Sequence, residues 1–406
     1  MTYLDGLVVL VALGCFALFA LPGIRNNPGW RAMVTPLASI IGSGFLVIAP
    51  MLAEISGRFA VLDMVGIVVV AFVIGAVIRF NIAHSEPLQT GKVDCPTGLI
   101  TATRLAQSAL TVAYVISVAF YIRLLASFVL SLTPYGIGIY EDGLATLVLL
   151  LIGFIGWWRG LHGLEFVETL TVSVKLSIIV AMLLALALHN GSTGVWLADL
   201  GTSAVDPVTH VRMLAGMLLV VQGFETSRYL GHEYSAGLRR SSMRWAQIVS
   251  GVIYIAFVAL VMPLLVFLPH GVLEETAIIA LTGHVALILP LILVLAAFMS
   301  QMSAAIADTV GAGGLLAEES GERISENAAY PALIGLAIVL IWSFNIFEVI
   351  TIASRAFAFY YMMQALIAFL VAGWLFDGWK RGIYQLWLLG MIVVLGAVVV
   401  FAIPVE

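Results

Sequence analysis

Three charged residues of this sequence lie within or beside long apolar stretches. Lys175 stands in the middle of one stretch, Glu225 follows a glycine in another, and Asp308 stands near the end of a third. A charge buried in a bilayer is costly, so such residues mark candidate functional sites. We therefore predict that Lys175 carries a coupling proton and that Glu225 contacts a ligand. Asp308 either belongs to an ion site or gate, or caps a helix at the cytoplasmic edge.

Two of these residues also have a structural interpretation. Lys175 can be held permanently by backbone carbonyls and by a hydroxyl such as that of Ser300 or Ser303, two further candidates for an ion site or a gate. Glu225 can instead pair with Arg228, three residues further along a helix. Tyr114 is a gate candidate as well, since it can cover a pocket with other aromatic residues, namely Phe120, Tyr121 and Phe224.

Two short motifs interrupt apolar stretches with poor helix formers. Ile41-Gly42-Ser43-Gly44 lies between Pro36 and Pro50, and Gln222-Gly223-Phe224-Glu225 follows an apolar run. Backbone that unwinds inside a membrane leaves N–H and C=O groups free, and these bind a carboxylate at one helix end and an ammonium or a cation at the other. We predict that both motifs bind substrate. The alternative is that their small residues only allow close helix packing.

The composition indicates the kind of element that carries these residues. Of 406 residues, 62% are hydrophobic and 10% are charged, whereas soluble domains have roughly 45–50% and about 25%. A soluble enzyme, a disordered chain and a nucleic-acid-binding protein are therefore excluded, and long apolar runs favour helices over a barrel. The two cysteines show no metal-ligand spacing, and no catalytic or nucleotide-binding motif occurs. We expect no cofactor, no metal and no enzymatic activity.

The apolar runs predict about twelve membrane-spanning helices. They lie near residues 4–22, 34–53, 62–84, 98–132, 143–158, 165–188, 210–230, 245–268, 283–307, 329–345, 347–372 and 383–402. With the N-terminus outside, 13 of the 18 Lys and Arg residues face the cytoplasm and two face out, while Arg123, Lys175 and Arg355 lie within spans. This bias predicts that both termini are extracytoplasmic.

The ten inner spans fall into two groups of five. Residues 32–188 form a first predicted repeat and residues 210–372 a second, which enters the membrane in the opposite orientation because each repeat has an odd number of spans. One extra helix precedes them at 1–22, and one follows at 383–402. The two interrupted motifs lie in the first helix of each repeat. Inverted repeats with matched helix breaks are typical of secondary transporters.

Several motifs resemble the amino acid–polyamine–organocation (APC) superfamily. The Gly42-Ser43-Gly44 stretch through Pro50 is similar to that family's first core helix, and Val221 to Glu225 to its sixth. Gly160 to Gly163 with the later Lys175 is similar to the fifth, and Glu233 and Arg239-Arg240 resemble the acidic residue and the basic loop after the sixth. The resemblance implies a LeuT-like fold that binds an amino acid or amine, with its carboxylate on the Gly-Ser-Gly amides and its amine on carbonyls of the broken helices.

The sequence also departs from that family. Gln222 replaces a glutamate of the sixth core helix, Asp308 stands where the eighth helix normally ends near an arginine, and one extra helix precedes the core. Since sodium-coupled relatives hold a cation near the position of Lys175, the resemblance implies that this lysine replaces the ion and couples transport to protons.

Together these features predict an all-α polytopic transporter in a plasma membrane, the inner membrane in a bacterium. It would be a proton-coupled symporter or an exchanger of an amino acid or related amine, with lipid, a small-molecule substrate and protons as its partners and no nucleic acid. Two alternatives stay open. One is an inorganic cation transporter on the same fold, and the other is a membrane ligand sensor that does not transport.

Overall fold

The computed structural model describes residues 3–42, 44–90, 96–136, 138–161, 165–196, 201, 205–267, 274–321 and 323–405. These residues form helices and loops, with no strand among them. The elements, in chain order, are α1 (Tyr3–Ala20), α2 (Pro22–Arg25), α3 (Pro28–Ile40), α4 (Gly44–Ser56), η1 (Gly57–Phe59), α5 (Ala60–His84), α6 (Glu86–Thr90), α7 (Leu99–Leu130), α8 (Gly138–Arg159), α9 (Glu165–Thr193), α10 (Pro207–Gly216), η2 (Leu218–Val221), η3 (Phe224–His232), α11 (Ala236–Leu265), α12 (Ala277–Thr282), α13 (Leu289–Glu319), α14 (Glu326–Ser343), α15 (Ile346–Leu375) and α16 (Gly378–Phe401).

The protein is an all-α polytopic membrane protein. Within the described ranges, ten helical stretches are long and apolar enough to cross a membrane, α4 to α6 counting as one (Gly44–Gln89). The predicted spans at 34–53 and 210–230 are not continuous helices. The first is divided between α3 and α4, and the second between α10, η2 and η3. The helix count therefore differs from twelve because two spans are interrupted near the predicted motifs.

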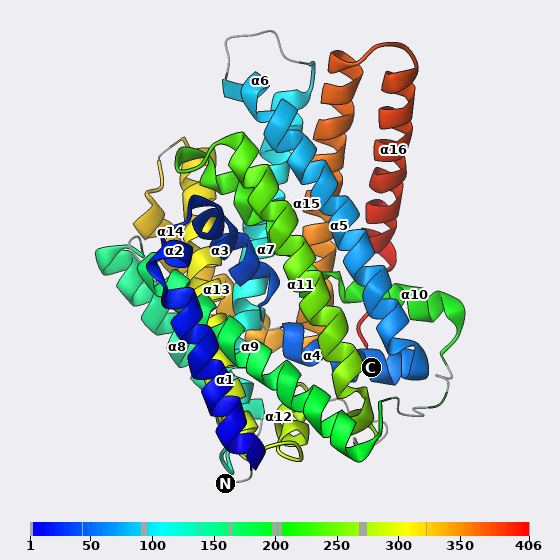
Figure 1. Cartoon of the computed structure of the whole chain (residues 1–406). Helices are drawn as coiled ribbons and strands as arrows, with labels where there is room; N and C mark the ends of the chain where they lie inside the picture. Colours follow the sequence, from blue (N-terminus) through cyan, green and yellow to red (C-terminus); the bar gives the residue numbers. More distant parts are fainter. Residues whose placement is uncertain are drawn as a thin grey trace.

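The bundle is arranged around α7, which packs against α13 and α15 (Figure 1). In the most apolar window of each helix, 83% of the residues of α7 are buried, but only 11% of those of α1 and of α16. The two extra helices predicted at the ends of the chain are thus peripheral: α1 packs on α9, and α16 on α15. The division of the remaining helices into two repeats stays a prediction.

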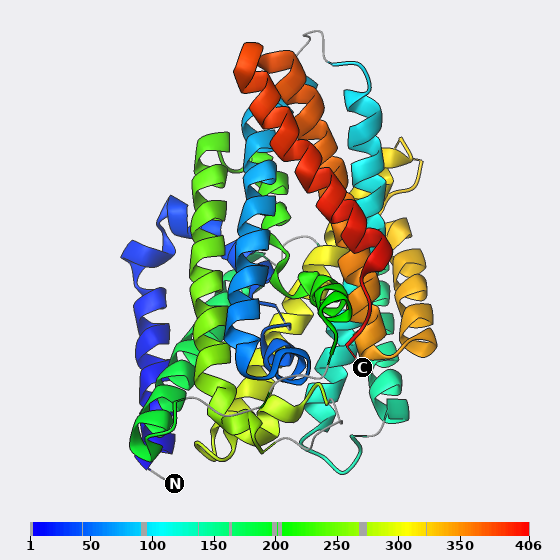
Figure 2. The same cartoon turned by 90° about the vertical axis from the view of Figure 1, so that its right-hand side faces the viewer.

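Different elements lie at the two ends of the bundle. Figures 1 and 2 show α6 and the turn between α15 and α16 at one end, whereas the start of α1 lies at the opposite end. The end that carries α6 is called the α6 end. The positions of Lys and Arg predict that it is cytoplasmic.

The two arginines placed within spans both have partners. Arg123 forms an ion pair with Asp142 at 3.2 Å and donates to the carbonyl of Ile341, near the end of α14. Arg355 donates to the carbonyl of Ala402 at 3.0 Å, just beyond α16. Both arginines therefore bind the ends of neighbouring helices. Of the three basic residues within spans, this leaves Lys175.

Candidate functional site

The first helix break lies between α3 and α4. The helix ends because Ile41 leaves the helical conformation, with ψ at 59°, and Gly42 follows it. Ser43 lies outside the described residues. Because the helical hydrogen bonds stop here, the last carbonyls of α3 need other donors. Side chains from three helices supply them.

Lys175 of α9 provides two of these hydrogen bonds. Its Nζ atom donates to the carbonyls of Ala38 at 2.9 Å and Ile41 at 2.5 Å, and to the Ser300 hydroxyl of α13 at 3.2 Å. The side chain is 4% exposed. Lys175 and Ser300 thus have the contacts that the structural interpretation predicted. The same contacts fit proton coupling, which stays a prediction for Lys175.

The second helix break runs from Met217 to Gly223. After α10, the chain forms the short η2 segment, and Gly223 then adopts a φ of +116°, which favours glycine. The break begins slightly before the predicted Gln222–Glu225 motif, and Glu225 itself lies in η3. The position of this break was therefore predicted to within about one helical turn.

The two breaks touch each other at glycines. A Cβ atom built on Gly223 would lie 2.3 Å from the Ser39 hydroxyl and 2.6 Å from the Ser39 carbonyl carbon. A Cβ atom on Gly44 would lie 2.8 Å from the side chain of Val220. Since both distances are shorter than real side-chain contacts, glycine is required at both positions. Gly44 and Gly223 hence serve the close packing of the two broken helices, as the packing interpretation expected for them.

Tyr254 of α11 joins the two breaks through one hydroxyl. Its oxygen lies 2.7 Å from the Val220 carbonyl oxygen and 2.9 Å from the Ile40 carbonyl oxygen, so the two carbonyls share its one proton. Tyr254 is fully buried. A single donor is therefore shared by one freed carbonyl of each broken helix.

Glu225 is fully buried beside the second break. Its Oε2 atom accepts from the Gly223 backbone N–H at 3.0 Å and from the Tyr361 hydroxyl at 2.7 Å. Its Oε1 atom has no hydrogen-bond partner among the described residues. The alternative pairing with Arg228 is wrong, since Arg228 reaches Gln364 at 2.6 Å instead.

Two glutamines near the breaks are also buried. The Gln222 side-chain nitrogen lies 3.2 Å from the Tyr121 hydroxyl, while its Oε1 atom has no partner in the part of the chain that the structure describes. Neither polar atom of the Gln301 side chain has a partner there either. Gln301 precedes Asp308 by seven residues, so the two lie on the same face of α13.

Aromatic rings pack together beside Glu225. Phe224 stacks on Tyr361 with ring centroids 5.2 Å apart and an angle of 16° between planes. Tyr114 contacts Phe357 edge-on at 6.2 Å and lies against Gly311 of α13. All these rings are buried. They pack on one another, and the role of Tyr114 as a gate stays a prediction.

A small cavity with both polar and apolar lining adjoins the first break. Its volume of about 20 Å³ suits a water molecule. Lys175, Asp308 and Ser303 line it together with hydroxyls of Ser39 and Thr226. Asp308 lies within α13, is 3% exposed and accepts a hydrogen bond from Ser117. The expectation that Asp308 caps a helix is therefore wrong, because α13 continues to Glu319.

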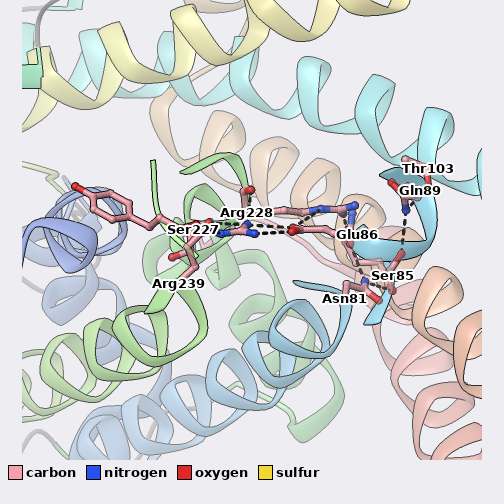
Figure 3. Close-up of polar contacts among 10 residues, drawn as sticks. Asn81, Ser85, Glu86, Gln89, Thr103, Ser227, Arg228 and Arg239 are labelled. Carbon is pink, nitrogen blue, oxygen red and sulfur yellow. Dashed lines mark hydrogen bonds and ion pairs between the residues drawn. The ribbon is translucent and has the colours of Figure 1, made fainter. Parts of the chain in front are cut away.

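A charged cluster lies at the α6 end of the bundle (Figure 3). Glu86 forms ion pairs with Arg239 at 2.6 Å and with Arg228 at 3.7 Å. Gln364 of α15 accepts from Arg228 and from Asn81 of α5, the latter at 2.8 Å. This cluster links α5, α6, η3, α11 and α15, so it can hold the α6 end closed.

The structure thus brings together most of the predicted site residues. Contacts at the breaks join Ile41, Gly42, Gly44, Gln222, Gly223, Phe224, Glu225, Lys175 and Ser300, with Ser303 and Asp308 at the adjoining cavity. Sequence reasoning missed Tyr254, Tyr361, Gln301 and Gln364. Each is a polar side chain in an apolar helix, a weak signal that many packed residues share.

A protein family and one relative match the part of the chain that contains this site. Residues 22–402 match the sequence profile of a family described as APC superfamily transporter. The chain is also 44% identical over 368 residues to an uncharacterized protein of Aquifex aeolicus (strain VF5), and the match covers 90% of each chain. The matched family region includes both helix breaks and every residue assigned to the site above.

Proposed function

The chain belongs to the APC superfamily of transporters, and we propose that it is a secondary transporter of an amino acid or related amine that binds at the two helix breaks. The observation that carries this proposal is the direct contact of two interrupted helices around buried polar side chains. Gly223 touches Ser39 there, and Gln222 and Glu225 lie beside them. Matched breaks of this kind commonly form the substrate site of secondary transporters.

The carboxylate of the substrate would bind at the start of α4. The first N–H groups of a helix have no partners inside the helix, and its N-terminus attracts negative charge. Gly42 and Gly44 allow the backbone to approach a ligand closely. The predicted role of Gly42, Ser43 and Gly44 as carboxylate-binding residues is retained in this proposal.

Lys175 would couple transport to protons. A charged lysine has three N–H donors, and the described contacts of Nζ include three acceptors, two of them carbonyls at the first break. Loss of a proton removes one donor and so weakens the hold on α3. Proton binding and the conformation of the first break are linked in this way.

Alternating access would open and close the two ends of the site in turn. The cluster of Glu86, Arg228 and Arg239 would be the cytoplasmic gate, since it joins η3 to α6 and α11. The termini would be extracytoplasmic, in a plasma membrane or bacterial inner membrane. Because no nucleotide-binding motif occurs, uphill transport would use an ion gradient or exchange.

Ligand binding to the purified protein tests this proposal. Thermal unfolding is measured with amino acids, amines and inorganic cations at acidic and neutral pH, because a ligand that binds the folded state stabilises it. We expect an amino acid or amine to raise the unfolding temperature and Gly42→Val to abolish that effect. Gly66→Val is the control, because a side chain there meets no atom within 4 Å. Stabilisation by inorganic cations alone would favour a cation transporter, and binding without uptake into liposomes would favour a sensor.

A further inference from the structure

The carbonyl groups freed at the breaks already have donors from the protein. Lys175 donates to the carbonyls of Ala38 and Ile41, as described above. The Tyr254 hydroxyl shares its one proton between those of Ile40 and Val220. The Gly223 carbonyl accepts from the Thr226 hydroxyl at 2.7 Å. A ligand amine that used these carbonyls would have to displace a buried protein donor from each.

Glu225 offers an acceptor that is not in use. Tyr361 and the Gly223 N–H both bind Oε2, which fixes the carboxylate and leaves Oε1 buried without a partner among the described residues. A buried, unpartnered carboxylate oxygen is costly, and an ionised carboxylate accepts hydrogen bonds but donates none. The ligand group that best removes this cost is therefore a positively charged N–H donor.

The aromatic rings around Glu225 do not form an open cage for a cation without N–H groups. Quaternary ammonium ions bind to the exposed faces of aromatic rings. Phe224 and Tyr361 stack on each other, so each ring covers one face of the other. Tyr361 also contacts Phe357 at 6.2 Å and Tyr360 at 5.3 Å. Hydrogen bonding to the carboxylate is thus the available way to recognise a nitrogen here.

We propose that Glu225 recognises the N–H groups of the substrate nitrogen and that the protein therefore selects primary and secondary amines over quaternary ammonium compounds. This inference rests on the proposed function, because it names the chemistry of the same site. A quaternary nitrogen keeps its charge but has no N–H group to donate to Oε1. Sites built to hydrogen-bond a ligand reject analogues that lack the donor by large factors, so we expect quaternary analogues to bind at least about 100-fold more weakly.

Matched ligand pairs test this selectivity in the wild-type protein. The pairs are ethanolamine and choline, glycine and glycine betaine, and putrescine and its fully methylated bis-quaternary analogue. Thermal unfolding of the full-length protein in detergent is titrated with each compound. We expect at least one N–H member to stabilise the protein and its methylated partner to need a concentration at least about 100-fold higher.

Two variants identify the residue responsible. Glu225→Gln keeps the size of the side chain but removes its charge, and should reduce the preference within each pair to less than about 10-fold. Glu233→Gln makes the same change at an exposed position in the next loop, and should leave the preference unchanged. If Glu225→Gln does not fold, the wild-type pairs still decide whether selectivity exists.

The outcomes separate this inference from the proposed function. Equal or tighter binding of the quaternary members, or an unchanged preference in folded Glu225→Gln, would overturn the inference and leave amine transport in place. If no member of any pair and no amino acid stabilises the wild-type protein, the proposed substrate class fails, and the inference fails with it.

Discussion

The hydroxyl of Tyr254 provides a direct test of how the two breaks are held together. Tyr254→Phe removes one oxygen atom and leaves the ring in place, so it creates almost no cavity. It removes the donor shared by the carbonyls of Ile40 and Val220, which are 2.9 Å and 2.7 Å away. Leaving buried polar groups unsatisfied costs roughly 1–3 kcal/mol. We therefore expect Tyr254→Phe to lower the free energy of unfolding by about that amount.

Tyr330 offers the matched control for this substitution. Its ring is also fully buried, but its hydroxyl has no hydrogen-bond partner among the residues that the structure describes. Tyr330→Phe removes a hydroxyl that makes no described bond, so it should be neutral or slightly stabilising. The two variants differ in hydrogen bonding and share the same change in size.

Thermal unfolding of both variants in detergent measures the difference. For a chain of this length, 1–3 kcal/mol corresponds to a fall of roughly 1–4 °C in the midpoint, whereas Tyr330→Phe should not lower the midpoint. The reasoning is refuted if Tyr254→Phe is as stable as the wild type, or if both variants lose stability equally. Either result would mean that the hydroxyl does not support the breaks.

Three further predictions concern the coupling, the packing and the gate. Lys175→Met should abolish the pH dependence of uptake into liposomes while exchange continues, and a pH profile like that of the wild type would count against proton coupling. Gly223→Ala should prevent normal folding, because its Cβ would lie 2.6 Å from the Ser39 backbone. In the control Gly231→Ala, the new Cβ has no atom closer than 3.6 Å, so this variant should be tolerated. The yield of monodisperse protein measures the difference. Glu86→Gln should speed hydrogen exchange at the α6 end, since it breaks two ion pairs. Glu233→Gln should leave the exchange rate unchanged. Equal exchange rates in the two variants would argue against a gate.

Several local features could be predicted from the sequence because they depend on residue type and order. Long apolar runs require helices in a membrane, where every backbone polar group needs a partner. Glycine and polar residues within such runs predicted the two breaks, one between α3 and α4 and the other within about one turn of Gln222. α1 and α16 are peripheral, and the ten-helix core with two repeats stays a prediction.

The partners of the buried charges could not be predicted from local spacing. Arg228 follows Glu225 by three positions, which suggested a pair, but the side-chain partner of Glu225 is Tyr361, 136 positions away. Asp308 was expected at a helix end and instead lies inside α13 against Ser117. In both cases the rotation of a helix about its axis decided which neighbour the side chain meets.

The sequence alone therefore determined that this chain spans a membrane as helices, where two of those helices break, and which family it resembles. Only the tertiary structure decided which atoms fill the breaks. The carbonyls at the first break are bound by residues of α9, α11 and α13, which lie more than 100 positions away in the chain. The physical reason is that apolar periodicity positions a helix in the bilayer, whereas a hydrogen bond depends on the relative rotation and depth of two packed helices, which side-chain packing sets.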